Sequence, residues 1–288
     1  MNEITILAHA KINLALDIVK KRTDGYHEIC SIMQSIGLSD VVSLRLSEET
    51  AVMTNIPALN NQKNLAYKAA QLYGAEAFIK IEKNIPFEAG LGGASADAAA
   101  VLFGLNELCK KYTNEELFEL AAQIGSDVPF FLMGGTVLSS GRGEILKKLS
   151  DFPGDVSKDY TMVIVKPPFG ASTKEVYGAL RTDLPYPRPN IQMIIDDGIS
   201  VESLAANGGN SLEHVTIKIF PEIQDIKDNL TASGAVLSLM SGSGSSVYGI
   251  FEDARQAVNA AERLSKFDEN RYTVHLAKPK NESMELRL

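Results

Sequence analysis

Three glycines fall within four residues, at Gly90, Gly92 and Gly93, inside the segment 86–96, which reads PFEAGLGGASA. Glycine adopts backbone conformations that a Cβ atom forbids, and it lets backbone amides approach an anion closely. The alanine- and leucine-rich stretch that follows predicts a helix, and the free N–H groups at its start would face the glycines. The segment is therefore typical of a phosphate-binding loop, although a closely packed helix start would need glycine as well.

Two other nucleotide-binding motifs do not fit. The chain has no G-x-x-x-x-G-K-[ST] sequence and so lacks the P-loop. The Rossmann fingerprint would need a third glycine where Ser95 stands and a βαβ unit before it, whereas the N-terminal region reads as consecutive strands. A dinucleotide-dependent oxidoreductase therefore rests on glycine spacing alone.

The charge and the cysteine content exclude several classes of protein. The 288 residues include 28 Lys and Arg against 36 Asp and Glu, a formal net charge of −8. A nucleic acid polymer is therefore not an expected partner, since binding one needs clustered basic residues. No apolar run approaches the roughly 20 residues that span a membrane, and the N-terminus does not read as a signal peptide. Two isolated cysteines, Cys30 and Cys109, favour a reducing cytoplasm over a disulfide framework.

Strand patterns come first in the chain and helical patterns are inserted among later ones. Strands rich in β-branched residues are expected first at residues 4–8, 12–19, 29–34 and 41–46. The pair Asp24-Gly25 predicts a turn between the second and third strands. Periodicity lapses into acid, proline and glycine at residues 151–158. We therefore expect an α+β chain rather than a doubly wound sheet, with domains over residues 1–152 and 153–288.

Three further segments place polar residues in apolar or turn surroundings. Asp127 stands in GSDVPF, where a buried carboxylate is uncommon unless paired or functional, although it could also cap a short turn. Lys11 interrupts an apolar strand pattern, so it either meets an anion or reaches solvent from an edge strand. The turn MSGSGSS at residues 240–246 is either a second phosphate-facing loop or a simple hairpin. The four histidines show no metal-ligand spacing, and a serine hydrolase elbow is missing.

Together and in this order, these segments resemble the GHMP kinase superfamily, which includes galactokinase, homoserine kinase and mevalonate kinase. The resemblance spans nearly the whole chain. Its most specific part is AKINLALDIVKKRTDGYHEICSIMQSIGLSD at residues 10–40, and the other matching segments are residues 86–108, 124–135, 210–215 and 239–251. The resemblance implies a two-domain fold with an N-terminal ribosomal-protein-S5-domain-2-like domain and a C-terminal ferredoxin-like α/β sandwich.

Within the superfamily, the KIN and DGYHE motifs are similar to those of members that use ATP to phosphorylate the 2-hydroxyl of methylerythritol linked to cytidine diphosphate, in non-mevalonate isoprenoid biosynthesis. This implies that Asp127 accepts the proton of the attacking hydroxyl, while Lys11 holds the carboxylate ionised and stabilises negative charge. Asn13 would bind the sugar-alcohol chain. Mg²⁺ would offset the charge of the ATP phosphates, with no side-chain ligand assigned.

The resemblance also assigns the two ligand sites. The ATP phosphates would be wrapped by Pro86, Phe87, Glu88, Ala89, Gly90, Leu91, Gly92, Gly93, Ala94, Ser95 and Ala96. Tyr26 would stack on cytosine, His27 would bind the edge of the base, and Tyr177 would close the sandwich, unless Tyr177 is a core residue of a helix face. The family loop more often carries a second hydroxyl where Ala96 stands, so the backbone amides would carry more of the binding.

Two other functions stay open from the sequence. Another GHMP kinase, of the homoserine or mevalonate type, would share the glycine loop but has no need for DGYHE. A GHMP-fold binding module without catalysis would need neither Lys11 nor Asp127, and both are present. The expected partner is a small molecule, and no heptad or apolar stripe distinguishes a monomer from a homodimer.

Overall fold

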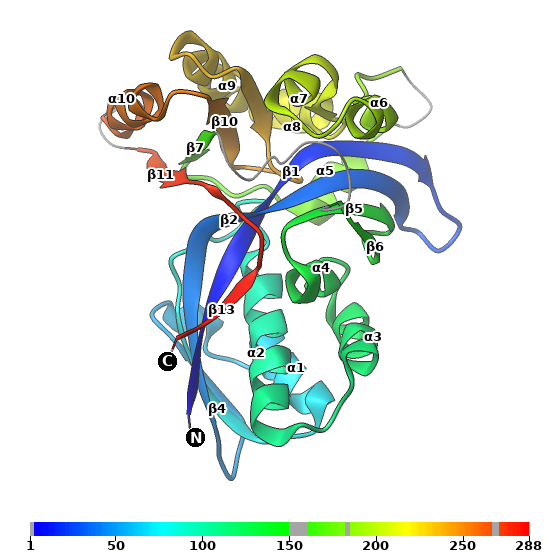
Figure 1. The fold of residues 1–288 in the computed structure, drawn as a ribbon, viewed down its shortest axis with the longest axis vertical. Coiled ribbons are helices and arrows are strands. Elements are labelled where there is room, and N and C mark those ends of the chain that lie inside the picture. Colours follow the sequence, from blue (N-terminus) through cyan, green and yellow to red (C-terminus); the bar gives the residue numbers. More distant parts are fainter. Residues whose placement is uncertain (1–2, 150–159, 182–184, 267–270, 288) are drawn as a thin grey trace.

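The computed structural model describes residues 3–149, 160–181, 185–266 and 271–287. A long antiparallel hairpin of β1 (Ile4–Lys21) and β2 (His27–Leu46) runs through the molecule (Figure 1). The turn between the two strands contains Gly25 at φ +88°, as the Asp-Gly pair predicts. The four short strands expected from the sequence are thus two long ones. Register shifts, including one between His9 and Ala10, interrupt the apolar pattern without ending the strand.

Further strands and four helices complete the first half of the chain. They are β3 (Ala51–Thr54), β4 (Ala77–Glu82), β5 (Thr136–Gly141) and β6 (Ile145–Lys148), with α1 (Leu65–Tyr73), α2 (Gly93–Cys109), α3 (Asn114–Ile124) and α4 (Val128–Met133). The strands β4 and β5 both pair with β2, and β3 and β6 lie beyond them. A short 3-10 turn (Pro57–Leu59) precedes α1.

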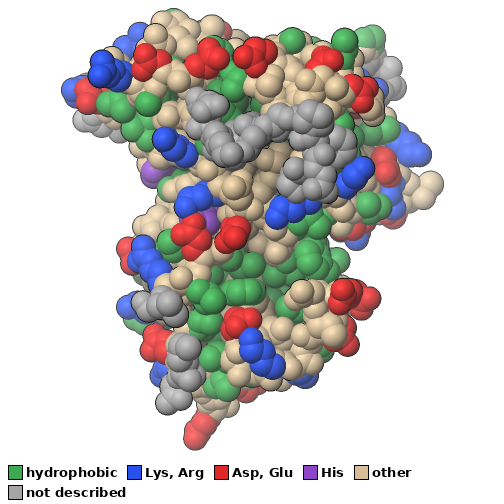
Figure 2. All heavy atoms as spheres, viewed as in Figure 1, with side chains coloured by type: hydrophobic (Ala, Val, Ile, Leu, Met, Phe, Trp, Pro, Cys, Tyr) green, Lys and Arg blue, Asp and Glu red, His purple; other side chains and the backbone are tan. Residues whose placement is uncertain are grey.

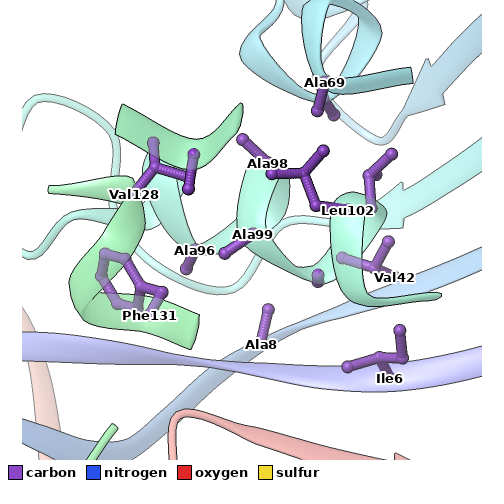
Figure 3. Packing of buried hydrophobic residues seen from close by; sticks show 14 of the residues in the cluster. Ile6, Ala8, Val42, Ala69, Ala96, Ala98, Ala99, Leu102, Val128 and Phe131 are labelled. Carbon is purple, nitrogen blue, oxygen red and sulfur yellow. The ribbon is translucent and has the colours of Figure 1, made fainter. Parts of the chain in front are cut away.

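Helix α2 packs across β1 and β2 through small side chains (Figure 3). Ala98 and Ala99 are fully buried in this core with Ile6 and Val42 of the two strands. A Cβ atom on Gly104 would lie only 2.6 Å from a methyl group of Leu44, so helix and sheet are in close contact. The alanine-rich sequence after the glycines therefore sets how near the start of α2 comes to the strand that carries Lys11.

The second half of the chain builds a four-stranded antiparallel sheet. Its strands are β7 (Thr161–Lys166), β9 (Leu237–Met240), β10 (Val247–Phe251) and β11 (Thr273–Ala277), in the order β11-β7-β10-β9. The helices of this half are α5 (Thr173–Ala179), α6 (Ile191–Asp196), α7 (Val201–Asn207), α8 (Glu213–Ile219), α9 (Glu222–Ala232) and α10 (Ala254–Ser265). Helices α9 and α10 contact this sheet. The spatial order of the strands and the β-α-β-β-α-β connection are those of a ferredoxin-like unit, which confirms the expected α+β class.

Three short strands of the second half join the first sheet. Strand β8 (Gly209–Asn210) pairs with the middle of β1, and β12 (Pro279–Lys280) pairs with β2. Strand β13 (Met284–Arg287) pairs with the start of β1 (Figure 1). No pattern in the sequence predicts this return of the chain, because such short strands have no periodicity of their own. The expected boundary at residue 152 lies outside the described residues, so the division of domains stays a prediction.

Acidic and basic side chains are interspersed on the face shown in Figure 2. Within the described ranges, none of the helices has the length and apolar character needed to span a bilayer.

Candidate active site

Lys11 lies inside the protein, on the central part of β1. It is 4% exposed, and its Nζ atom is 3.7 Å from Oδ2 of Asp127 and donates a hydrogen bond of 2.7 Å to Oδ1 of Asn13. Burial lowers the pKa of Lys11, and the Asp127 carboxylate opposes this effect. The alternative of a surface lysine on an edge strand is therefore wrong. The structure brings together three residues named from the sequence.

Asp127 is not a capping residue. It precedes α4 directly, but its side chain makes no capping hydrogen bond with that helix. The side chain is 39% exposed, so one side faces the Lys11 ammonium and the other is open to solvent. A carboxylate in this setting can accept a proton from a hydroxyl group that approaches from solvent.

Asn13 has most of its hydrogen-bonding capacity committed within the protein. Its Oδ1 atom accepts the bond from Lys11, and its Nδ2 atom donates a bond of 2.8 Å to the Ser31 hydroxyl. The Ser31 hydroxyl in turn donates to the carbonyl of Ala15. The Asn13 amide therefore orients the lysine first, and one Nδ2 hydrogen is left for a ligand.

The glycine loop lies directly on Lys11. The carbonyl of Leu91 accepts a hydrogen bond of 3.0 Å from the Lys11 amide. A Cβ atom on Gly92 would lie 2.6 Å from the Phe131 ring and 3.1 Å from Cγ of Lys11, and Gly92 has φ +74°. Both the backbone conformation and the close approach require glycine here. The loop thus delivers the start of α2 to the lysine.

At the start of α2, several donors are available for an anion. The amides of Ser95 and Ala96 bond back to the Gly92 carbonyl, whereas the described hydrogen bonds include none donated by the amides of Gly93 and Ala94. The Ser95 hydroxyl is half-exposed and likewise makes none of the described bonds. The Ala96 side chain is buried in the core, so this position offers no side-chain contact to a ligand.

The first residues of the segment 86–96 face different surroundings. Phe87 is exposed, and Glu88 has φ +49°, a conformation that is uncommon outside glycine. A Cβ atom on Gly170 would lie 2.3 Å from Oε2 of Glu88, so the loop rests against the connection between β7 and α5. Pro86 is half-buried and Ala89 is buried.

The end of the β1–β2 hairpin meets α5. The rings of His27 and Tyr177 have centroids 5.2 Å apart at an interplanar angle of 42°. Burial raises the pKa of Tyr177, and the Asp127 charge adds to this, which places the pair near the carboxylate. Tyr26 is 54% exposed, and the Arg142 guanidinium lies 5.1 Å from the centroid of its ring. His27 and Tyr177 therefore form a ring pair near Asp127, whereas the Tyr26 ring contacts Arg142.

The turn at residues 241–246 is more than a simple hairpin. It joins β9 to β10 and packs on the glycine loop, where the Ser241 hydroxyl donates to the Gly90 carbonyl at 2.9 Å and the Ser246 amide donates to Ala89 at 3.1 Å. A Cβ atom on Gly90 would lie 2.0 Å from the Ser241 carbonyl oxygen. The two loops fit together only because Gly90 has no side chain.

One buried charge cluster beside the loop escaped the sequence analysis. The Lys83 ammonium binds the carboxylates of both Asp40 and Asp97, and all three groups are nearly inaccessible to solvent. The amides of Asn84 and Ile85 also donate to Asp40. Burial raises the pKa of Asp97, and Lys83 opposes this rise. Asp97 lies in the second turn of α2, so the cluster ties the loop helix to β2 and to the residues after β4. The sequence around Lys83, KNIP at residues 83–86, does not predict this charge cluster.

The chain also matches two models of a known protein family. The family model for the GHMP kinases N terminal domain matches residues 64–135, and the model for the GHMP kinases C terminal domain matches residues 197–270. The chain belongs to the GHMP kinase family. The resemblance inferred from the sequence is thereby confirmed, and so is the two-domain fold of the family.

Two relatives of high identity within the family carry the same name. The 4-diphosphocytidyl-2-C-methyl-D-erythritol kinase of Pelotomaculum thermopropionicum is 44% identical over 92% of this chain and 95% of its own length. That of Acetivibrio thermocellus is 46% identical, also over 92% and 95%. A crystal structure of a 4-(cytidine 5'-diphospho)-2C-methyl-D-erythritol kinase is 33% identical, with a TM-score of 0.77, and covers 95% of this chain and 99% of that one. A homoserine kinase from Cytophaga hutchinsonii has a TM-score of 0.78 at 18% identity and thus shares the fold.

Proposed function

We propose that this protein is an ATP-dependent kinase that phosphorylates the 2-hydroxyl of 4-diphosphocytidyl-2-C-methyl-D-erythritol. Relatives that are 44–46% identical over nine-tenths of the chain support the substrate. The observation that carries the chemistry is the Lys11–Asp127 pair at 3.7 Å, beneath a glycine loop that starts a helix.

In the proposed mechanism, the chain orients the acceptor and manages one proton. Asp127 accepts the proton of the 2-hydroxyl as that oxygen attacks the γ-phosphorus of ATP, while the bond from the γ-phosphorus to the β,γ-bridging oxygen breaks and ADP leaves. Lys11, held by Asn13, stabilises the negative charge that develops beside it. The amides at the start of α2 bind the ATP phosphates, aided by the positive end of the helix. Positioning and electrostatics of this kind supply most of the catalysis in phosphoryl transfer.

Magnesium fits this arrangement as a part of the proposal. The described residues include no cluster of three or more acidic, histidine or cysteine side chains that could hold a metal ion alone. Mg²⁺ does not need one, because it commonly binds through substrate phosphates and one or two protein oxygens. The Ser95 hydroxyl beside the loop suits that role. When bound, the ion would neutralise charge on the ATP phosphates.

An assay of three acceptors tests the proposed function. Purified protein is incubated with ATP and with the cytidine diphosphate polyol, homoserine or mevalonate in turn, and ADP release is measured. We expect turnover with the cytidine substrate alone. Turnover with homoserine or mevalonate instead would indicate another kinase of the family, and no turnover with any acceptor would support the binding-module alternative.

A cytoplasmic location and the choice between monomer and homodimer stay predictions.

Tyr26→Ala tests the recognition of cytosine. Loss of one stacking partner should raise the KM for the cytidine substrate about tenfold, because stacking contributes ~1–3 kcal/mol per base. The KM for ATP should not change. Tyr26→Phe is the matched control, because it keeps the ring and should retain the KM of the wild-type protein. An equal rise in both KM values in Tyr26→Ala would contradict the stacking role.

A further inference from the structure

Asn210 is a buried amide outside the residues assigned so far, and it binds the turn 241–246, here called the serine loop. It is 6% exposed, and its Nδ2 atom donates to the carbonyls of Met240 at 2.8 Å and Gly242 at 2.7 Å. Its Oδ1 atom accepts a bond of 2.9 Å from the Leu212 amide. Both amide hydrogens are therefore used, and the side chain can adopt only one orientation, since a flipped amide would place its oxygen against two carbonyls.

Glu213 binds the serine loop at the same end as Asn210. Its Oε1 atom accepts a hydrogen bond of 2.6 Å from the amide of Met240, and its second oxygen binds the Lys227 ammonium. Asn210 and Glu213 thus bind the carbonyl and the amide of a single residue, Met240, at the base of the serine loop. The residues lie three apart in NSLEHV, a segment matched to the family in the sequence analysis without an assigned role.

Asn210 is also fixed to β1, the strand that carries Lys11. Strand β8 pairs in parallel with β1, so that Asn210 lies opposite Leu16, and the next amide, of Ser211, donates to the Leu16 carbonyl at 2.8 Å. Lys11 and Asn13 stand a few residues earlier on the same strand. The serine loop is therefore positioned relative to β1 through Asn210, and not only through its own hairpin.

Gly242 of the serine loop lies close to Lys11 and Asn13. A Cβ atom on Gly242 would lie 3.4 Å from Nζ of Lys11 and 3.5 Å from Oδ1 of Asn13. The described hydrogen bonds include none donated by the amides of Gly242 and Ser243, while the carbonyls of Met240 and Gly242 are directed to Asn210. Donors without a partner beside a buried ammonium are suited to an anionic oxygen.

We infer that Asn210 and Glu213 are positioning residues for phosphoryl transfer, which orient the serine loop so that its amides meet a phosphate oxygen of the substrates beside Lys11. The inference rests on the proposed function. A positioning role differs from a purely structural one, because it requires the rate of phosphoryl transfer to depend on the orientation of the Met240 and Gly242 carbonyls.

Asn210→Asp is the decisive variant. It keeps the size of the side chain and its acceptor for Leu212, but it presents an oxygen to the two carbonyls that Nδ2 now binds. We expect kcat to fall about 100-fold, since a displacement of ~1 Å at a reacting centre can cost that much. The KM for the cytidine substrate should change far less, because the substitution does not alter Tyr26, His27 or Tyr177, the residues proposed to bind cytosine. Asn229→Asp on α9 is the matched control and should keep full activity, since the one hydrogen bond of its Nδ2 atom within the described residues goes to the Asp225 carbonyl.

Glu213→Gln adds a graded comparison. Glutamine keeps an oxygen for the Met240 amide and loses only the charge that binds Lys227. It should therefore retain most of kcat, whereas Glu213→Ala should lose it as Asn210→Asp does. Circular dichroism and thermal unfolding establish that each variant is folded at the assay temperature. If Asn210→Asp does not fold, Glu213→Ala against Glu213→Gln provides the same test.

The outcomes separate this inference from the proposed function. A wild-type protein that fails to phosphorylate the cytidine substrate contradicts the proposed function. If the wild-type protein is active and folded Asn210→Asp has the same kcat, the inference is overturned and the proposed function stands. A lower melting temperature with an unchanged kcat would likewise assign Asn210 a structural role only.

Discussion

Asp127→Asn should lower kcat about 1,000-fold, because general base catalysis by a positioned side chain contributes ~10²–10⁴-fold. The substitution keeps the shape of the side chain and removes its capacity to take the proton. Nucleotide binding should be retained, since the glycine loop and the start of α2 do not bond to this carboxylate among the described contacts. Steady-state kinetics and calorimetric titration with an ATP analogue measure the two effects separately.

A matched control for Asp127→Asn is Asp228→Asn, which neutralises a carboxylate on the exposed face of α9. It should not alter kcat. Activity should also fall as the pH is raised, and for Asp127→Asn this fall should begin at a lower pH than for the wild-type protein. Asp127 raises the pKa of the buried Lys11, so without it the lysine gives up its proton earlier. Full activity of Asp127→Asn would exclude this residue as the base.

Lys83→Met should lower the free energy of unfolding by about 3 kcal/mol, because removal of one partner leaves buried charges uncompensated. Lys83 is the cation shared by Asp40 and Asp97 beside the glycine loop, and a Cβ atom on Gly93 would lie 3.4 Å from its ammonium. Urea denaturation measures the change. Lys80→Met is the matched control, since Lys80 is exposed on the neighbouring strand, and its unfolding free energy should match that of the wild-type protein.

The pH dependence of Lys83→Met follows from the two carboxylates. Burial already raises the pKa of Asp97, and loss of the lysine raises it further. A carboxyl whose pKa is higher in the folded state than in the unfolded state contributes stability at low pH and loses it as pH rises through the folded value. The destabilisation should therefore be smallest in acid and grow toward alkaline pH. The double variant Lys83→Met, Asp97→Asn should recover part of the loss, since Asp40 keeps its two backbone donors. A single variant as stable as the wild-type protein at every pH would contradict this account.

Some of the fold and most of the candidate site could be predicted from the sequence because they depend on local chemistry. The Asp-Gly turn and the glycines before an alanine-rich helix both carry signals within a few residues. Lys11 and Asp127 could be identified as candidates because a charged group within an apolar pattern is costly to bury unless it has a partner of opposite charge or a function. Taken alone, each segment also had an ordinary explanation, and only the joint order of the motifs favoured a kinase.

The alternatives for these residues were decided by contacts between distant parts of the chain. Lys11 is buried because the glycine loop covers β1 at that point, and Asp127 is free of capping because its side chain turns toward the lysine. Two further contacts have no pattern along the sequence. They are the ion pairs of Lys83 with Asp40 and Asp97, and the hydrogen bond from Asn210 to the Met240 carbonyl. Such contacts depend on the register of strand pairs and on the packing of helices, which local periodicity does not encode.

The charge of −8 and the glycine spacing are thus properties of the sequence by itself: they argue against a polymeric anion as a partner and favour a small one. That two loops, a lysine and a carboxylate lie together was decided by the tertiary structure. The physical reason is that a buried ammonium is stable only where a fold supplies oxygen atoms around it, and here those atoms come from β1 and the residue before α4.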